Sequence, residues 1–172
     1  SLLRGFSAPV KLSFEYSDDQ LLFLMKHDED GFNRWDAGQT LSVRILQRLI
    51  ESIKNNQKLV IPLSYIEAFR SILKDTCLDK AMVCKLLILP AESYLIQLSE
   101  ESDVDFIHQA REFVRGELAT HLSQELLAVY KDNAVYEGEN TLSYEAMSQR
   151  SLKNTALALL GACLNESALG VS

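Results

Sequence analysis

The sequence lacks most of the residues and patterns from which catalytic and metal sites are commonly built. Only three of its 172 residues are histidine and three are cysteine, and neither a His-x-x-x-His nor a Cys-x-x-Cys pair occurs. It contains no glycine-rich phosphate loop and no Gly-x-Ser-x-Gly motif. From the residues alone, these absences favour a non-catalytic module.

Basic clusters, long apolar runs and disulfide patterns are also missing. The net charge of −7 disfavours a general nucleic-acid binder, because phosphate contacts need clustered Lys and Arg. No apolar run reaches membrane-spanning length and no signal peptide is visible, so we expect no membrane span. The odd, sparse cysteines predict reduced thiols and a cytoplasmic location. They are Cys77, Cys84 and Cys163.

One strand pattern is present near the N-terminus. In residues 8–16, apolar and polar side chains alternate, with Val10, Leu12, Phe14 and Tyr16 on one face. This period of two predicts a half-buried β-strand. The chain offers no partner strand, and a lone strand leaves backbone N–H and C=O groups unpaired. We therefore expect its partners to lie outside this chain, as would be so if the chain is a piece of a larger protein.

The rest of the chain has the three- and four-residue apolar spacing of amphipathic helices. We expect one uninterrupted helix of about 30 residues to begin at Ser102 and Asp103. The predicted fold class is mainly α, a helical bundle or α-α superhelix of HEAT or armadillo type, preceded by one orphan β-strand. The other expected helices cover residues 19–26, 33–56, a segment that begins near Ser64, 79–89, 91–98 and 143–164.

Residues 23–41, FLMKHDEDGFNRWDAGQTL, hold the only tryptophan and a dense mix of charges. We interpret this stretch as a helix–turn–helix corner, in which Gly31 ends the first helix or starts the turn. Asn33 or Asp30 caps the second helix, and Trp35 packs back across the corner. Two alternatives remain open. They are a docking surface for another domain and a catalytic or metal site built from His27, Asp28, Asp30 and Asp36.

The remaining titratable residues do not form a recognisable site. His108 and His121 are thirteen residues apart on the predicted long helix, too far to share a metal ion without other ligands. The acidic residues at the start of this helix are interpreted as negative charges that interact favourably with the helix dipole. We accordingly predict no catalytic, cofactor-binding or metal-ligating residue in this chain.

Several motifs resemble bacterial aminopeptidase N, a family of zinc metallopeptidases of the gluzincin type. The order and spacing of Arg4–Val10 (RGFSAPV), Phe23–Asp28 (FLMKHD) and Phe32–Ala37 (FNRWDA) carry the resemblance. Leu86–Pro90 (LLILP) and Arg150–Asn154 (RSLKN) also fit the family's C-terminal region. The similarity extends over nearly the whole chain.

The resemblance implies that this chain is a fragment of a peptidase that removes N-terminal residues from peptides. Residues 1–17 would be the last strand of the family's small β-sandwich domain, and residues 18–172 the first part of its C-terminal helical domain. The family's His-Glu-x-x-His zinc motif and Gly-x-Met-Glu-Asn motif do not occur here. Zinc would therefore belong to the parent enzyme and not to this segment, which is expected to be inactive alone.

The implied role is to cap the catalytic chamber and control access of peptide substrates. The implied partners are the catalytic and β-sandwich domains of the same protein, and no nucleic acid. One alternative is an independent helical-repeat scaffold that binds peptides or proteins in a groove. Another is a small enzyme with an unrecognised site.

Overall fold

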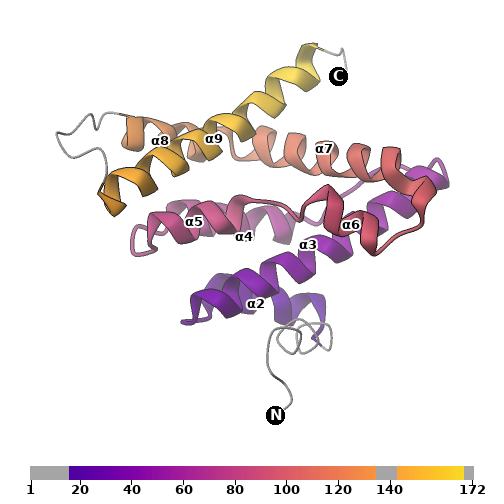
Figure 1. Ribbon diagram of the computed structural model, residues 1–172, viewed down its shortest axis with the longest axis horizontal. Coiled ribbons are helices and arrows are strands. Elements are labelled where there is room, and N and C mark those ends of the chain that lie inside the picture. The colour runs from indigo at the N-terminus through magenta and orange to yellow at the C-terminus, as the bar shows by residue number, and fades with distance from the viewer. Residues whose placement is uncertain (1–15, 135–142, 169–172) are drawn as a thin grey trace. The chain divides into compact units, whose positions relative to one another are not determined.

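The computed structural model describes residues 16–134 and 143–168, and every regular element in these ranges is a helix (Figure 1). The predicted mainly α class is confirmed. The strand expected in residues 8–16 lies outside the described residues, apart from Tyr16. The elements are α2 (Asp18–His27), α3 (Gly31–Lys54), α4 (Leu63–Lys74), α5 (Lys80–Leu87), α6 (Glu92–Gln97), η1 (Glu101–Asp103), α7 (Val104–His121), α8 (Ser123–Ala134) and α9 (Tyr144–Ala168).

The chain divides into two compact units. The described part of unit 1 comprises residues 16–68 and 89–111, and that of unit 2 comprises residues 69–88, 112–134 and 143–168. Two of the three boundaries fall inside helices, one within α4 and one within α7, and the third lies between α5 and α6. Each unit has its own buried residues and is described by itself.

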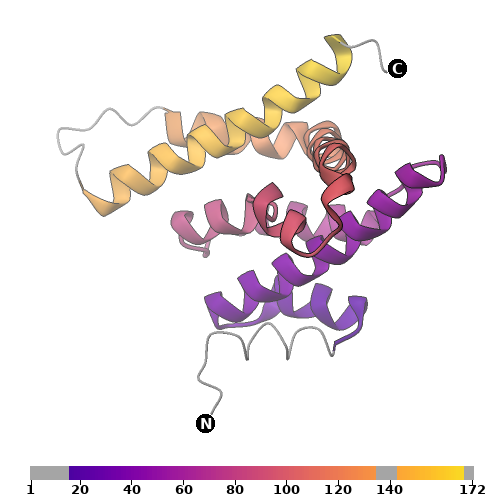
Figure 2. The ribbon, with the colours of Figure 1, turned by 45° about the vertical axis from the view of Figure 1, so that its right-hand side comes forward.

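Helices α2 and α3 form the first packed pair of unit 1 and lie side by side in both views (Figure 1, Figure 2). Ser17 caps α2 in a capping box. Its hydroxyl accepts from the Gln20 N–H at 3.2 Å, and its own N–H donates to the Gln20 side chain at 2.8 Å. Leu21 and Met25 are the fully buried side chains of α2. Ser17 is therefore the N-cap of α2.

The turn between α2 and α3 consists of three acidic residues. The Asp28 carboxylate accepts from the Asp30 N–H at 2.8 Å. Asp30 caps α3 by accepting from the N–H groups of Phe32 at 2.8 Å and Asn33 at 3.3 Å. Of the two predicted caps, Asp30 is thus correct. Gly31 is the first residue of α3 and does not end α2, because Asp28 already leaves the helix in an extended conformation.

Arg34 carries the hydrogen bonds that cross this corner. Its side chain is 8% exposed, its Nε donates to the Met25 carbonyl at 3.0 Å, and its Nη2 donates to the Lys26 carbonyl at 3.0 Å. Carbonyls in the last turn of a helix have no intrahelical partner, so a guanidinium satisfies them well. The Trp35 ring contacts Phe32 in the same helix turn, at 5.9 Å between centroids.

Helix α3 ends at a pair of asparagines. Asn55 is the C-cap, and Asn56 has a left-handed φ of 53°. The Gln57 N–H donates to the Ser52 carbonyl at 2.8 Å, and the Asn56 N–H donates to the Ile53 carbonyl at 3.2 Å. These two bonds define a Schellman motif in which asparagine takes the position usually held by glycine.

In unit 2, α9 contacts both α8 and α5, and α8 and α9 lie side by side in both views (Figure 1, Figure 2). The hydroxyl of Ser143 caps α9 through the Ala146 N–H at 3.1 Å. Leu152, Ala156 and Leu159 are buried, whereas Met147 is exposed. The side chain of Cys163 lies outside those that the structure describes.

The single long helix expected from Ser102 is wrong, because it is interrupted at Leu122 between α7 and α8. At this point Arg70 Nη2 donates to the His121 carbonyl at 3.2 Å, while Arg70 Nη1 lies 2.6 Å from both oxygens of Glu125. A side chain that enters the backbone hydrogen-bond ladder is a known cause of helix breaks. The apolar spacing continues through Leu118, Leu122 and Leu126, which explains why the sequence pattern did not indicate the break.

We predict that the Arg34→Lys substitution lowers the free energy of unfolding of unit 1 by about 2 kcal/mol, because a lysine cannot reproduce two charge-assisted bonds to buried carbonyls. Urea unfolding followed by the fluorescence of Trp35 measures this. Arg48→Lys is the matched control, since Arg48 lies in the same helix but is largely exposed. It should change stability by less than about 0.5 kcal/mol. Equal effects of the two substitutions would contradict the role assigned to Arg34.

We also predict an acid-sensitive contribution from Asp18, which joins α2 to α3 through Arg44 at 3.0 Å and Arg48 at 2.7 Å. Partial burial alone would raise the pKa of the Asp18 carboxyl, but hydrogen bonds and attraction from Arg48 and Arg44 outweigh burial and hold this pKa below its ordinary value. A lowered folded-state pKa stabilises the fold above about pH 4, and this stabilisation disappears as the pH falls through the folded-state value.

The test compares urea unfolding of the wild type and Asp18→Asn between about pH 2 and pH 6. The difference in unfolding free energy should be largest near pH 6 and should shrink at the acid end. A difference that stays constant with pH would exclude a contribution from the Asp18 charge.

Candidate functional site

The side chains considered for a catalytic or metal site in the corner are used in other ways. His27 is exposed, and its ring lies 5.0 Å from that of Phe23. Asp28 and Asp30 accept backbone hydrogen bonds in the turn, and Asp36 lies further along α3. Within residues 16–134 and 143–168, no group of three or more His, Cys, Asp or Glu residues is arranged to hold a metal ion. These described side chains do not fit the zinc ion that the resemblance implies for the parent enzyme.

The other two histidines belong to different units and are both exposed. His108 Nδ1 lies 3.5 Å from an oxygen of Glu92 in unit 1. His121 Nε2 lies 3.3 Å from an oxygen of Glu117 in unit 2. Each histidine therefore has a local carboxylate neighbour, and the predicted absence of catalytic, cofactor-binding and metal residues stays a prediction.

Of the two cysteines with described side chains, Cys84 is in an environment that makes its thiol a poor nucleophile. Cys77 is exposed, while burial raises the pKa of the Cys84 thiol. Thr155 Oγ1 lies 3.9 Å from Cys84 Sγ and also donates to the Ser151 carbonyl at 2.8 Å. Because the thiolate is the reactive form, a buried thiol with a raised pKa is a poor nucleophile.

Lys54 and Asp103 form an ion pair at the edge of a hollow of about 460 Å³ in unit 1. Lys54 Nζ lies 2.9 Å from one oxygen of Asp103 and 3.1 Å from the other. This hydrogen bond raises the pKa of the Lys54 ammonium above its ordinary value, against the opposing effect of desolvation. Since each charge already serves the other, we interpret the pair as a tie between the end of α3 and η1.

A second cavity in unit 1 has the features of a binding site. It has a volume of about 240 Å³ and lies between α3 and the segment that leads into α6. The lining combines aromatic and aliphatic side chains with two buried polar ones, Asp36 at 5% exposure and Thr40 at 4%. Ligand sites in proteins are concave and mostly apolar, with a few placed polar groups. The lining residues are Trp35, Asp36, Gln39, Thr40, Val43, Pro90, Ala91 and Tyr94.

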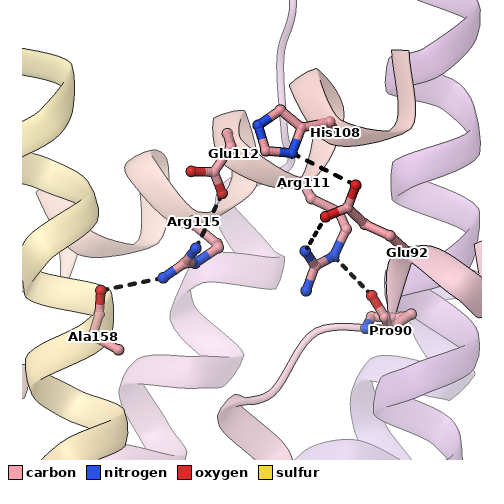
Figure 3. Close-up of polar contacts among 7 residues, drawn as sticks. All are labelled: Pro90, Glu92, His108, Arg111, Glu112, Arg115 and Ala158. Atoms are coloured by element: carbon pink, nitrogen blue, oxygen red, sulfur yellow. Dashed lines mark hydrogen bonds and ion pairs between the residues drawn. The ribbon is translucent and has the colours of Figure 1, made fainter. Parts of the chain in front are cut away.

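Hydrogen bonds from outside the cavity hold the wall formed by residues 90–94. Figure 3 shows Arg111 of α7 beside this segment, where its Nε donates to the Pro90 carbonyl at 2.9 Å. Arg111 Nη1 lies 3.4 Å from an oxygen of Glu92, the first residue of α6. The other oxygen of Glu92 faces His108. Arg111 therefore positions both residues that flank Ala91.

The opposite wall is a single face of α3. Residues 35, 36, 39, 40 and 43 recur at intervals of three and four, so they share one side of the helix. The ring contact with Phe32 supports the Trp35 indole. Sequence reasoning considered Asp36 only as part of the corner and did not identify the cavity. The available signal was a pair of polar residues, Asp36 and Thr40, whose spacing of four places them on the same helix face.

The fold and this arrangement define the chain as a helical-repeat domain. Residues 18–170 match a family described as "Domain of unknown function (DUF3458_C) ARM repeats". The match covers most of the chain, so the chain belongs to this family of ARM-repeat domains.

The relatives found by sequence carry the name aminopeptidase N. The protein of Escherichia coli K12 is 38% identical over 160 residues, and that of Caulobacter vibrioides is 33% identical over 162 residues. The protein of Haemophilus influenzae is 30% identical over 160 residues. These matches cover 93–94% of this chain but only 18% of each relative. The predicted resemblance to bacterial aminopeptidase N, as a segment of it, is confirmed.

A solved structure with a similar fold is the crystal structure of Legionella pneumophila aminopeptidase A in complex with aspartic acid. The TM-score is 0.74 at 20% identity, and the similarity covers 88% of this chain and 18% of that one. It supports the helical fold alone. In the described part of the chain, no helix has both the length and the apolar composition that a membrane crossing requires.

We predict that Arg111→Gln loosens the wall formed by residues 90–94 and increases the quenching of Trp35 fluorescence by acrylamide. It should also lower the stability of unit 1 by about 1–2 kcal/mol through the lost bonds to Pro90 and Glu92. Arg115→Gln is the matched control, because Arg115 bonds Glu112 at 3.1 Å and the Ala158 carbonyl at 3.2 Å within unit 2 (Figure 3). If both substitutions change Trp35 quenching equally, Arg111 does not position this wall.

Proposed function

We propose that this chain is a segment of a zinc aminopeptidase that removes N-terminal residues from peptides. The observation that carries the proposal is that three relatives with this name each match nearly the whole chain over 18% of their own length. In the proposed arrangement, residues 18–172 form the first part of a C-terminal helical domain. Residues 1–17 form the end of a small β-sandwich domain that precedes it.

The proposed role of the segment is to cap the catalytic chamber of a cytoplasmic enzyme and control which peptides enter. It contributes no catalytic residue, and the zinc ion belongs to the remainder of the parent protein. Several charged side chains stabilise the fold, which supports an accessory role. Asp30 caps a helix, and Arg34 and Arg111 bond backbone carbonyls. Glu125 pairs with Arg70.

The first experiment measures bound zinc and the hydrolysis of alanyl and leucyl chromogenic amides on one sample of the 172-residue chain. We expect far less than one zinc ion per chain and no turnover above a buffer control. Stoichiometric zinc together with turnover would overturn the accessory role, because the chain would then contain a complete active site.

The second experiment separates an aminopeptidase segment from an independent peptide-binding scaffold. The 160 residues of the E. coli aminopeptidase N that match this chain are replaced by the corresponding residues of this chain. We expect the chimera to be soluble and to cleave the alanyl amide, with a changed ratio of activity on long and short peptides. A variant that lacks the segment should lose this activity. A chimera no more active than the deletion variant would contradict the proposed function.

A further inference from the structure

We propose that the cavity between α3 and α6 binds the arginine side chain of a peptide, with its guanidinium group between Trp35 and Tyr94 and facing Asp36. All the residues concerned belong to unit 1. The proposal concerns ligand binding and does not depend on peptidase activity, so it can fail or succeed independently of the proposed function.

The size of the cavity indicates a single side chain. Its volume of about 240 Å³ is below the range of about 300–1,000 Å³ typical of pockets for drug-sized ligands and cofactors. Val43 and Pro90 supply apolar surface, which suits the three methylene groups of an arginine stem. Tyr94 is 39% exposed, so the cavity has an edge at the surface through which a side chain can enter.

The charge of the lining selects a cation. Asp36 is almost fully buried and lines a cavity whose other residues carry no formal charge. Asp36 is itself held by another contact, which fixes its position in advance. A carboxylate offers about four acceptor positions, so a held carboxylate still accepts from a ligand. Arg111, which holds the 90–94 wall, is engaged with Glu92 and the Pro90 carbonyl.

The combination of a carboxylate with two aromatic side chains favours guanidinium over the alternatives. A guanidinium is planar and weakly hydrated, stacks on aromatic faces, and donates two parallel bonds to a carboxylate. An ammonium is more strongly hydrated and lacks this planar fork. A phenyl or leucyl side chain offers the buried Asp36 carboxylate no hydrogen-bond donor, whereas a guanidinium offers two.

The test uses Trp35 as a reporter, because it is the only tryptophan in the chain. The 172-residue chain is titrated with Nα-acetyl-arginine amide and, separately, with Nα-acetyl-citrulline amide, which has nearly the same shape but no charge. We expect a saturable change in Trp35 emission with arginine and a dissociation constant about tenfold lower than with citrulline. Nα-acetyl-lysine amide at the same ionic strength should fall between them.

Three variants assign the effect to this cavity. Asp36→Asn keeps the shape of the side chain and should abolish the preference for arginine over citrulline. Glu29→Gln removes the same charge from the exposed turn and should leave the preference unchanged. Tyr94→Leu should weaken arginine binding several-fold through the lost ring, and it provides a second test at a half-exposed position if Asp36→Asn does not fold. Folding of each variant is checked by its thermal melting curve.

Three results would overturn the proposal. The first is the absence of a saturable response to arginine in the folded wild type. The second is equal affinity for arginine and citrulline. The third is a preference for arginine over citrulline that persists in folded Asp36→Asn, because the binding site would then lie elsewhere. An unchanged affinity for arginine in folded Tyr94→Leu would lead to the same conclusion. Tighter binding of an acetylated phenylalanine amide would instead identify an apolar pocket.

Discussion

The buried guanidinium of Arg34 is the constraint from which the geometry of unit 1 follows. A buried guanidinium needs hydrogen-bond acceptors, and the last carbonyls of α2 need donors. The bonds from Arg34 to the Met25 and Lys26 carbonyls satisfy both requirements. The three-residue turn allows this contact because Asp28 and Asp30 satisfy the turn's own N–H groups. Once α3 is held in this way against α2, its side chains have fixed directions. The face that carries residues 35, 36, 39, 40 and 43 then lines a cavity instead of the α2 interface.

Most of the helices could be predicted because their signals are local. Capping residues act within about one turn of the helix end, as Ser17, Asp30 and Asn55–Asn56 do here, and Asp30 was among the caps expected from the sequence. The break at Leu122 could not be predicted, since it depends on Arg70, which is about fifty positions away in the sequence. The apolar repeat continues through that point and favours one helix. The expected role of Gly31 was wrong because Asp28 and Asp30 accept the backbone N–H groups of this turn, which therefore does not need a glycine to end α2.

The candidate site was less predictable than the fold. His27, Asp28 and Asp30 lie in a short stretch rich in acidic residues, which left a catalytic or metal site open as an alternative. In the structure, the carboxylates of Asp28 and Asp30 accept hydrogen bonds from backbone N–H groups of the turn. The cavity instead joins a face of α3 to residues 90–94, which are about fifty positions further on. Spacing along one chain cannot show that these segments meet. The pair Asp36 and Thr40 carried a local signal, because polar residues rarely occupy a buried helix face without a purpose.

Several charged side chains in the described part of the chain are used to hold the fold together. A catalytic group must change its protonation or bonding during a reaction, and a side chain committed to holding the fold cannot do this freely. Arg34, Arg70, Lys54 and Asp103 each hold two segments of their own unit together. Asp36 is likewise held by a contact, and it also lines the cavity of about 240 Å³ in unit 1. Helical-repeat proteins bind partners through the extended concave surfaces that their stacked repeats form, so recognition by this domain would use surfaces and cavities between its helices.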